Sequence, residues 1–556
     1  MITSAKKSFG ILLLIWAAGF SLQAASTKPN IIVILTDDHG WADLGSQGVF
    51  DYVKTPHTDR LAKSGVRFTS GYVTAPQCRP SRAGLMSGRY QNRFGLEHNG
   101  HNAFPWSDYT IAERLRDVGY VTGMAGKWHL DGYVDSLGKL PDGSDASLAQ
   151  INGGGRAEAK KNRLAPNPGQ VHRHGFMEHL SGSLTNYVAS HSADGKALGG
   201  VVAHTDERYR LEVQAEWSVN FIKRHAKGDK PFFLYTSFYA PHVPLEAPEK
   251  YLSRIPEDLP LRRRKALAML AAVDDGVGLI TQTLQDEGAL ENTIIFYIGD
   301  NGAPLKMHKA DAPGNGPGWD GSLNDPWIGE KGMLTEGGIR VPFIASWPAG
   351  IPGDQIDDRP VISLDAIATA LVAGGAELDA NIDGVDLLPY LAGGLSAHPQ
   401  EFLYWRWAGQ YAVRSGDWKY LKAGKREYLF DLSTEAQESE NLIHTRPEIA
   451  ANLKTHLTRW SEEQFEPGFD HPVGYAGDRY FDFYLDGKRA PVPAPVSRSN
   501  NQSSLFERRD QNKDGLVSLE EFIGAPKGRN IPVLTKRFHA LDKDGDSHLS
   551  ELEMSN

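Results

Sequence analysis

Near its N-terminus the chain reads Ile31-Ile32-Val33-Ile34-Leu35-Thr36-Asp37-Asp38, an apolar run that stops at polar residues. A continuous apolar run of this kind is typical of a strand that is buried on both faces of a sheet. Three later runs have the same form and also stop at turn-forming or charged residues; they cover 120–125, 232–235 and 293–298. These runs predict the central strands of one sheet.

Amphipathic helical patterns lie between the runs, at 59–62, 111–115, 211–224 and 267–284. Strands that alternate with helices indicate an α/β fold with helices on both faces of the sheet. In such folds the functional groups gather beyond the carboxyl ends of the strands. We therefore expect one site to combine the polar residues that follow the four runs, namely Asp37, Asp38, Lys127, His129, His242, Asp300 and Asn301.

The first 25 residues have the form of an export signal. Lys6 and Lys7 precede an apolar stretch at 11–20, and small residues follow at 23–26. The apolar stretch is short for a bilayer, and we expect no later segment to be long enough to span one. The prediction is a secreted or periplasmic protein without a membrane anchor in its mature form.

Composition limits the partners. The chain has 556 residues, 40% of them hydrophobic and 23% charged, which is ordinary for a globular protein. Its formal net charge of −10 argues against nucleic acid as a partner, because phosphate binding needs a basic face. A local basic pocket for an anionic substrate is compatible with this charge.

The chain has a single cysteine, Cys78, which therefore cannot form an intramolecular disulfide. It is either a small buried residue or a functional one. Pro80 suits the first turn of a helix, which places Cys78 at the helix N-terminus, where free N–H groups favour an anion. Arg82 lies one turn further on and can reach the same place. This arrangement predicts a nucleophile beside a binding place for a tetrahedral oxyanion.

The run Cys78-Arg79-Pro80-Ser81-Arg82 resembles the Cys-x-Pro-Ser-Arg signature of type I sulfatases, in which the cysteine is oxidised to formylglycine. Further motifs follow in the order of that family at 36–38, 126–130, 240–244, 299–302, 331–342 and 428–442. The resemblance implies an alkaline-phosphatase-like mixed central sheet with helices on both faces. A smaller antiparallel C-terminal subdomain would follow it.

The resemblance also implies the roles of the site residues. Asp37, Asp38, Asp300 and Asn301 would bind Ca²⁺, or Mg²⁺, together with the modified residue 78 and the sulfate. A hydroxyl of hydrated formylglycine would attack sulfur, and the aldehyde would then reform as sulfate leaves. Arg82, Lys127 and Lys331 would bind the diol and the sulfate oxygens. His129 would act on the diol proton, and His242 would protonate the leaving oxygen.

The end of the chain carries two acidic loops that match the EF-hand pattern of calcium ligands. The first would use Asp510, Asn512, Asp514, Leu516, Ser518 and Glu521. The second would use Asp542, Asp544, Asp546, His548, Ser550 and Glu553, with Ser547 where a glycine is usual. We expect up to two further Ca²⁺ ions here, in a structural clip or a docking module.

The predicted organisation is a signal peptide (1–25), a catalytic domain (26–400), a C-terminal subdomain (401–489), a linker (490–502) and an α-helical EF-hand pair (503–556). The predicted function is hydrolysis of sulfate esters in a polysaccharide or oligosaccharide. A formylglycine-generating enzyme or a sulfatase maturase would be needed to modify Cys78. The alternatives are a phosphonate or phosphate ester hydrolase of the same fold, and a non-catalytic calcium-binding or docking protein.

Overall fold

The computed structural model describes the chain in segments, at 28–99, 104–105, 107–130, 170–305, 321–434, 437–467 and 478–488, with short pieces between 512 and 549. The chain forms two compact units, Met1–Gly487 and Lys488–Asn556. The predicted signal peptide, the predicted linker and most of two long polar loops, 131–170 and 304–327, lie outside the described residues.

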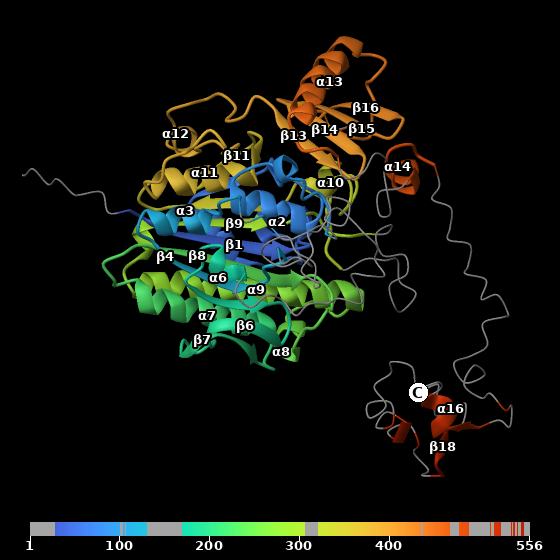
Figure 1. Ribbon diagram of the computed structural model, residues 1–556. Coiled ribbons are helices and arrows are strands. Elements are labelled where there is room, and N and C mark those ends of the chain that lie inside the picture. Colours follow the sequence, from blue (N-terminus) through green and yellow to red (C-terminus); the bar gives the residue numbers. More distant parts are fainter. Residues whose placement is uncertain are drawn as a thin grey trace, which may run out of the picture. The chain divides into compact units, whose positions relative to one another are not determined.

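A ten-stranded mixed sheet forms the centre of the first unit (Figure 1). Its order is β11 (Gln355–Asp357), β2 (Val66–Phe68), β10 (Phe343–Ser346), β9 (Thr293–Gly299), β1 (Asn30–Asp37), β8 (Phe232–Pro241), β4 (Val121–Gly126), β5 (Glu178–Gly182), β6 (Asn186–His191) and β7 (Ala197–Thr205). The four predicted runs are the neighbouring strands β9, β1, β8 and β4, which are mutually parallel. The predicted mixed sheet is confirmed.

Helices cover both faces of this sheet (Figure 1). One face carries α2 (Cys78–Ser87), α3 (Ile111–Asp117) and α11 (Ser363–Ala373), and the other carries α1 (Pro56–Lys63), α7 (Arg210–His225) and α9 (Leu261–Asp286). Alternate residues of β1 enter the two cores, Val33 on one side and Ile32 and Ile34 on the other. This explains the continuous apolar run, because a strand covered on both faces has no solvent-facing side.

The helix α9 differs from what the sequence predicted about membrane-length segments. It is long and apolar enough to cross a membrane, although we expected no such segment after residue 25. In the structure 78% of its apolar stretch is buried, and it packs against α7 and β8. Burial against a sheet and a second helix accounts for its composition, as in the core helix of a large domain.

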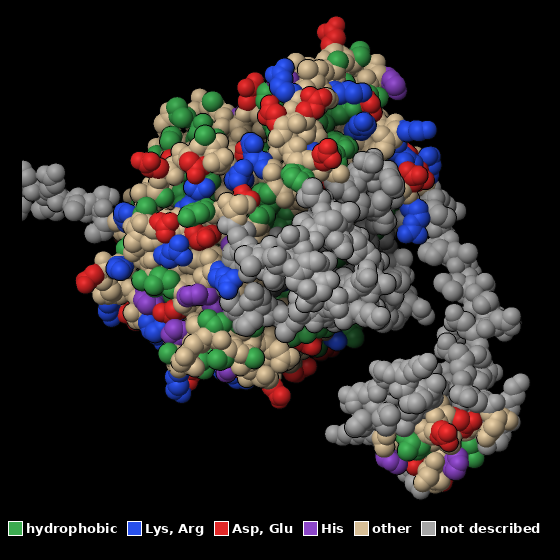
Figure 2. Space-filling view, viewed as in Figure 1, with side chains coloured by type: hydrophobic (Ala, Val, Ile, Leu, Met, Phe, Trp, Pro, Cys, Tyr) green, Lys and Arg blue, Asp and Glu red, His purple; other side chains and the backbone are tan. Residues whose placement is uncertain are grey.

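Four antiparallel strands form the predicted smaller sheet: β13 (Leu403–Trp407), β14 (Gln410–Ser415), β15 (Trp418–Ala423) and β16 (Arg426–Asp431). The helix α13 (Pro447–Glu462) packs on it. The first unit also contains β3 (Gly71–Tyr72), paired with β12 (Val361–Ile362), and the short helices α6 (Gln170–Arg173), α8 (Glu249–Leu252), α10 (Glu336–Ile339), α12 (Leu388–Leu391) and α14 (Asp478–Tyr484). Acidic and basic side chains are interspersed over the face shown in Figure 2.

The described part of the second unit joins the two acidic loops. The strand β17 (Val517–Ser518) pairs antiparallel with β18 (His548–Leu549), and α16 (Leu519–Ile523) follows β17 directly. Val517, Phe522, Phe538 and Leu549 form a small apolar core. Ser547, where a glycine is usual, has φ of 68°, the left-handed conformation that a glycine would adopt easily.

Candidate active site

The ends of the four parallel strands bring the predicted residues to one edge of the sheet. Asp37 of β1 is level with Pro241 of β8, and Gly126 of β4 is level with Ser237 of β8. Gly126 has φ of 97°, and a Cβ there would lie 2.0 Å from the Ser237 carbonyl oxygen, so only glycine allows this approach. Lys127 follows immediately, and its amide donates to Ser237.

The side chain of Cys78 points at this edge from the N-terminus of α2. Cys78 is the first residue of that helix and is 1% exposed, and Pro80 lies in the first turn as predicted. The thiol donates to Asp37 Oδ1 over 3.3 Å, and Lys331 Nζ donates to the sulfur over 3.1 Å. Burial, reinforced by Asp300, raises the pKa of the Cys78 thiol well above its usual value. An unmodified cysteine is therefore held as a neutral thiol, which is a poor nucleophile.

Arg82 holds the carboxylates in place. Its Nε donates to Asp300 Oδ2 over 3.0 Å, and its Nη2 lies 2.8 Å from the same oxygen and 3.6 Å from Asp37. Its Nη1 donates to Ser237 Oγ and to the Lys127 carbonyl. The guanidinium is fully buried, so it fixes Asp37 and Asp300 relative to each other.

Two buried lysines donate hydrogen bonds to Asp37 and Asp38. Lys127 Nζ donates to Asp37 Oδ2 over 2.5 Å, and Lys331 Nζ donates to Asp38 Oδ1. Burial raises the pKa of Asp38, but Lys331 and His242 outweigh this effect and hold it below the usual range. Asp38 has φ of 63°, a strained conformation for a residue other than glycine, and its amide donates to Asp300 Oδ1.

The same residues fit a bound cation. Asp38 Oδ2 and Asn301 Oδ1 are buried and accept no hydrogen bond from any residue that the structure describes. The Asn301 amide nitrogen donates to Asp38 Oδ1 and to the Gly302 carbonyl, which fixes the orientation of its oxygen. Burial, reinforced by Asp37, raises the pKa of Asp300 to about 7. Crowded carboxylates and unpartnered carbonyl oxygens are the donors that Ca²⁺ and Mg²⁺ prefer.

Potential ligand atoms of Asp37, Asp38, Cys78 and His242 lie within 4.8 Å of one another. In the family chemistry the Cys78 sulfur would stand where an oxygen of hydrated formylglycine lies. A hard cation would therefore meet oxygen at that position rather than a thiol, consistent with the donors around it.

The two predicted histidines lie at different places. His242 Nε2 is 3.6 Å from Asp38 Oδ2, and its Nδ1 donates to the Val243 carbonyl over 2.7 Å. Burial lowers the pKa of His242 to about 4, although Asp37 and Asp38 oppose this shift. His129 lies near Lys127, Arg79 and Arg82, and burial with these charges lowers its pKa well below the usual value.

The site also contains residues that the sequence did not single out. Tyr235, Ser237 and Tyr239 lie on β8; the hydroxyl oxygens of the first two accept hydrogen bonds from Arg82 Nη1, and the ring of Tyr239 stacks on His242. They alternate along one strand, so they share a face of the sheet. That period of two along β8 was the available signal.

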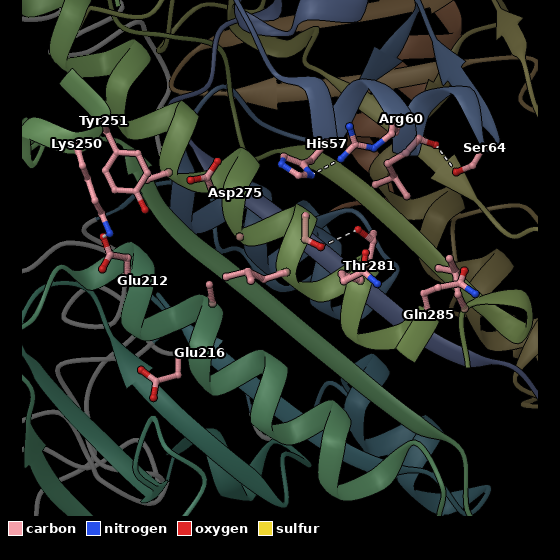
Figure 3. A pocket seen from close by; sticks show the side chains of 18 of the residues that line it. His57, Arg60, Ser64, Glu212, Glu216, Lys250, Tyr251, Asp275, Thr281 and Gln285 are labelled. Carbon is pink, nitrogen blue, oxygen red and sulfur yellow. Dashed lines mark hydrogen bonds and ion pairs between the residues drawn. The ribbon is translucent and has the colours of Figure 1, made fainter. Parts of the chain in front are cut away.

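A separate cavity of about 870 Å³ lies between α1, α7, α8 and α9 (Figure 3). None of the predicted catalytic residues lines it. Its charged groups are paired with protein groups: Lys250 with Glu212, and Asp275 with Arg254. The neighbouring Asp274 accepts from the amides of His57 and Thr58 at the start of α1, so its carboxylate serves the helix N-terminus.

Comparison with known proteins shows the family of the chain. Residues 29–376 match the family described as Sulfatase. The dog protein N-acetylgalactosamine-6-sulfatase is 31% identical over 502 residues, covering 86% of this chain and 88% of the dog protein. The crystal structure of Ps i-CgsB in complex with k-i-k-neocarrahexaose has a TM-score of 0.64 and 27% identity, covering 80% of this chain and 96% of that one. A phosphonate monoester hydrolase from Silicibacter pomeroyi has a TM-score of 0.55 but 20% identity, covering 79% and 96%, which shows a shared fold alone.

Proposed function

This chain belongs to the sulfatase family and hydrolyses sulfate esters, and we propose that its substrates are sulfated carbohydrates, cleaved with a formylglycine made from Cys78. The observation that carries the proposal is the position of the Cys78 sulfur. It lies at the N-terminus of α2, between a carboxylate of the candidate metal site and the ammonium of Lys331. A buried thiol with a raised pKa has little use there, whereas an oxygen nucleophile at that position could contact a cation.

When present, the formylglycine and a Ca²⁺ ion held by Asp37, Asp38, Asp300 and Asn301 supply an activated oxygen nucleophile and a positive charge for the sulfate. The chain's own residues do the rest. Lys331 donates a hydrogen bond at position 78, and Lys127 places a second ammonium beside Asp37, so both can stabilise negative charge on sulfate oxygens. Arg82 keeps Asp37 and Asp300 in place.

His242 is suited to protonate the leaving oxygen. Because its Nδ1–H is donated to the Val243 carbonyl, Nε2 is the nitrogen left to give a proton. A sulfate ester would bring a negative charge beside the ring and raise its pKa from about 4. The leaving oxygen would take the proton from Nε2 as its bond to sulfur breaks and the oxygen nucleophile bonds to sulfur in its place. We propose His129 for the proton of the nucleophile, because it follows β4 at the same edge of the sheet and its lowered pKa leaves the imidazole neutral and able to accept a proton.

The carbohydrate class rests on the relatives. The dog protein is named for a sulfated amino sugar, and the Ps i-CgsB structure contains k-i-k-neocarrahexaose. An exported enzyme would meet such polymers outside the cytoplasm, and the sequence of the first 25 residues predicts export. Cys78 is 1% exposed, so the formylglycine-generating enzyme or maturase would act before the chain folds around it.

The second unit would bind Ca²⁺ as an EF-hand pair. Val517 and Leu549 hold the same place in their two loops and pair with each other, which relates the loops symmetrically. The Glu521 carboxylate accepts from the amide and hydroxyl of Ser518 and from the Asn512 amide, so it lies where its loop closes. Calcium stoichiometry of the full chain tests this: Glu521→Ala should lower it by one equivalent. An unchanged stoichiometry would refute the first loop.

The test of the main proposal is sulfate release from a panel of sulfated glycans and their oligosaccharides, using protein whose residue 78 carries formylglycine. Release that disappears in Cys78→Ala is the expected result, and the glycan that responds names the substrate. If fully modified enzyme releases sulfate from aryl esters but from no glycan, the carbohydrate class is wrong. Hydrolysis of phosphonate esters in preference to every sulfate ester would support the alternative predicted from the sequence.

A further inference from the structure

The ring of Tyr239 lies at the centre of three side chains of the active site. It stacks on the imidazole of His242, with ring centroids 4.9 Å apart and planes 26° from parallel. Lys127 Nζ lies 4.8 Å from the Tyr239 centroid, and the Arg210 guanidinium lies 5.3 Å from it. Stacked rings and cations over an aromatic face attract each other through the quadrupole of the ring.

The backbone of Tyr239 is fixed by α7. Its amide donates to Gln214 Oε1 over 3.3 Å, and Arg210 Nε donates to its carbonyl over 3.2 Å. Arg210 Nη2 also donates to the Pro244 carbonyl over 2.8 Å. One buried guanidinium therefore holds the chain on both sides of His242, before it at Tyr239 and after it at Pro244.

The imidazole of His242 needs such support. Its Nδ1 is held by the Val243 carbonyl, and its Nε2 is 3.6 Å from Asp38, so both contacts lie at the edge of the ring. Edge contacts alone leave the ring free to tilt. The side chain is 20% exposed, and the face of Tyr239 supplies the contact that sets the plane of the ring.

We propose that Tyr239 is a positioning residue for leaving-group protonation: it holds the plane of the His242 ring so that Nε2 faces the leaving oxygen. The proposal rests on the proposed role of His242 as general acid. Lys127 keeps its 2.5 Å ion pair with Asp37 without the Tyr239 ring, so loss of the ring should affect His242 more than sulfate binding.

The test compares substrates that differ in their need for a proton. An alkyl sulfate such as a sugar sulfate has a poor leaving group, whereas 4-nitrophenyl sulfate leaves as a stable anion. Tyr239→Leu should lower kcat for the sugar sulfate by about 10- to 100-fold and kcat for 4-nitrophenyl sulfate by about threefold or less. Tyr239→Phe keeps the ring and should recover most of the lost rate.

Two controls separate this role from a general loss of structure. Tyr251 also lies beside two cations, Lys250 and Arg254, but it lines the separate cavity (Figure 3), so Tyr251→Leu should change neither rate. In a His242→Ala background, Tyr239→Leu should have little further effect, because the two residues act as one unit.

The outcomes are distinct. Equal losses on both substrates in Tyr239→Leu, or failure of Tyr239→Phe to recover the sugar sulfate rate, would overturn the inference while sulfatase action stands. If the wild-type enzyme with formylglycine releases no sulfate from either substrate, the proposed function itself fails.

Discussion

Two clusters of buried charges in the first unit have opposite character. The active-site cluster contains Asp37, Asp38, Asp300, Arg82, Lys127 and Lys331 together with the amide of Asn301, and the junction cluster contains Glu336, Glu438, Arg340, Arg414 and Lys419. In the junction cluster every carboxylate oxygen accepts a hydrogen bond. Glu336 accepts from Tyr72, Arg340 and Lys419, and Glu438 accepts from Lys419 and from the Glu336 amide.

The active-site cluster is not closed in this way. Asp38 Oδ2 and Asn301 Oδ1 accept no hydrogen bond from the residues that the structure describes. The Cys78 thiol contacts Asp37, Asp38 and Lys331. Burying an unpartnered polar oxygen costs free energy. Buried charge alone therefore does not identify a functional site. The junction cluster connects the β3–β12 pair to the four-stranded sheet, whereas the active-site cluster has oxygens available for a ligand.

The largest effect is expected from removing a cation of the active-site cluster. Lys331→Met should lower kcat/KM for sulfate release by about 10³-fold, because its ammonium contacts both position 78 and Asp38. With Ca²⁺ present its melting temperature should change little, because the metal compensates the carboxylates. A full-rate Lys331→Met enzyme would show that the open cluster does not serve catalysis.

The corresponding change in the junction cluster should lower the stability of the protein rather than its activity. Lys419→Met leaves Glu336 and Glu438 buried without their shared partner, which should cost about 3–5 kcal/mol in the free energy of unfolding. Urea denaturation measures this, with Lys422→Met on the same strand as a control that should change stability by about 0.5 kcal/mol or less. Equal stability of the two variants would contradict the structural role of the cluster.

Calcium bound at the active-site cluster should stabilise the folded protein. At a concentration near 100 times its Kd, an ion that binds the folded state alone adds about 2.7 kcal/mol to the free energy of unfolding. Asn301→Leu removes an unpartnered oxygen and should reduce the calcium-dependent rise in the melting temperature of the first unit. Glu521→Ala, in the second unit, is the control and should leave that rise intact. The same rise in Asn301→Leu would mean that this oxygen is not a ligand.

The last effect is the pH dependence of the junction cluster. Burial raises the pKa of Glu438 to about 7, although Lys419 opposes it, while Lys419 and Arg340 hold the pKa of Glu336 near 2 against the effect of burial. The folded state therefore binds the Glu438 proton more tightly than the unfolded state does. The free energy of unfolding should fall as pH rises from about 4.3 to about 7.

Glu438→Gln has no proton to lose in this range. Relative to the variant, the wild-type protein should lose stability by about 3 kcal/mol between the two pH values. Melting temperatures measured across that range test this, with the exposed Glu440→Gln as a control that keeps the wild-type slope. A wild-type slope in Glu438→Gln would assign the pH dependence to other groups.

Much of this arrangement could be predicted from the sequence, because the relevant signals are local. The apolar runs at β1, β4, β8 and β9 identified the parallel centre of the sheet, and their polar ends identified one edge. Pro80 placed Cys78 at the start of a helix. Each of these inferences needed only a few adjacent residues, and the structure agrees with each.

The remainder depends on contacts between distant segments. Glu336 belongs to a motif that resembled the family, but its partners Lys419 and Glu438 come from the smaller sheet and its neighbourhood, so the sequence could not show that it serves the junction. The predicted binding of the diol and the sulfate by Arg82 stays a prediction, but its contacts with Asp37, Asp300 and Ser237 join distant segments and could not be predicted from the sequence. Tyr239 was missed because its role appears only when β8 and the loop after it fold back on α7.

The central claim is that sulfate release depends on formylglycine at position 78. The most direct measurement prepares the enzyme at several degrees of conversion, determined by mass spectrometry of the peptide that contains Cys78, and plots the rate of sulfate release against the converted fraction. We expect a straight line through zero. A rate that is independent of the converted fraction, or that persists in Cys78→Ala, would contradict it.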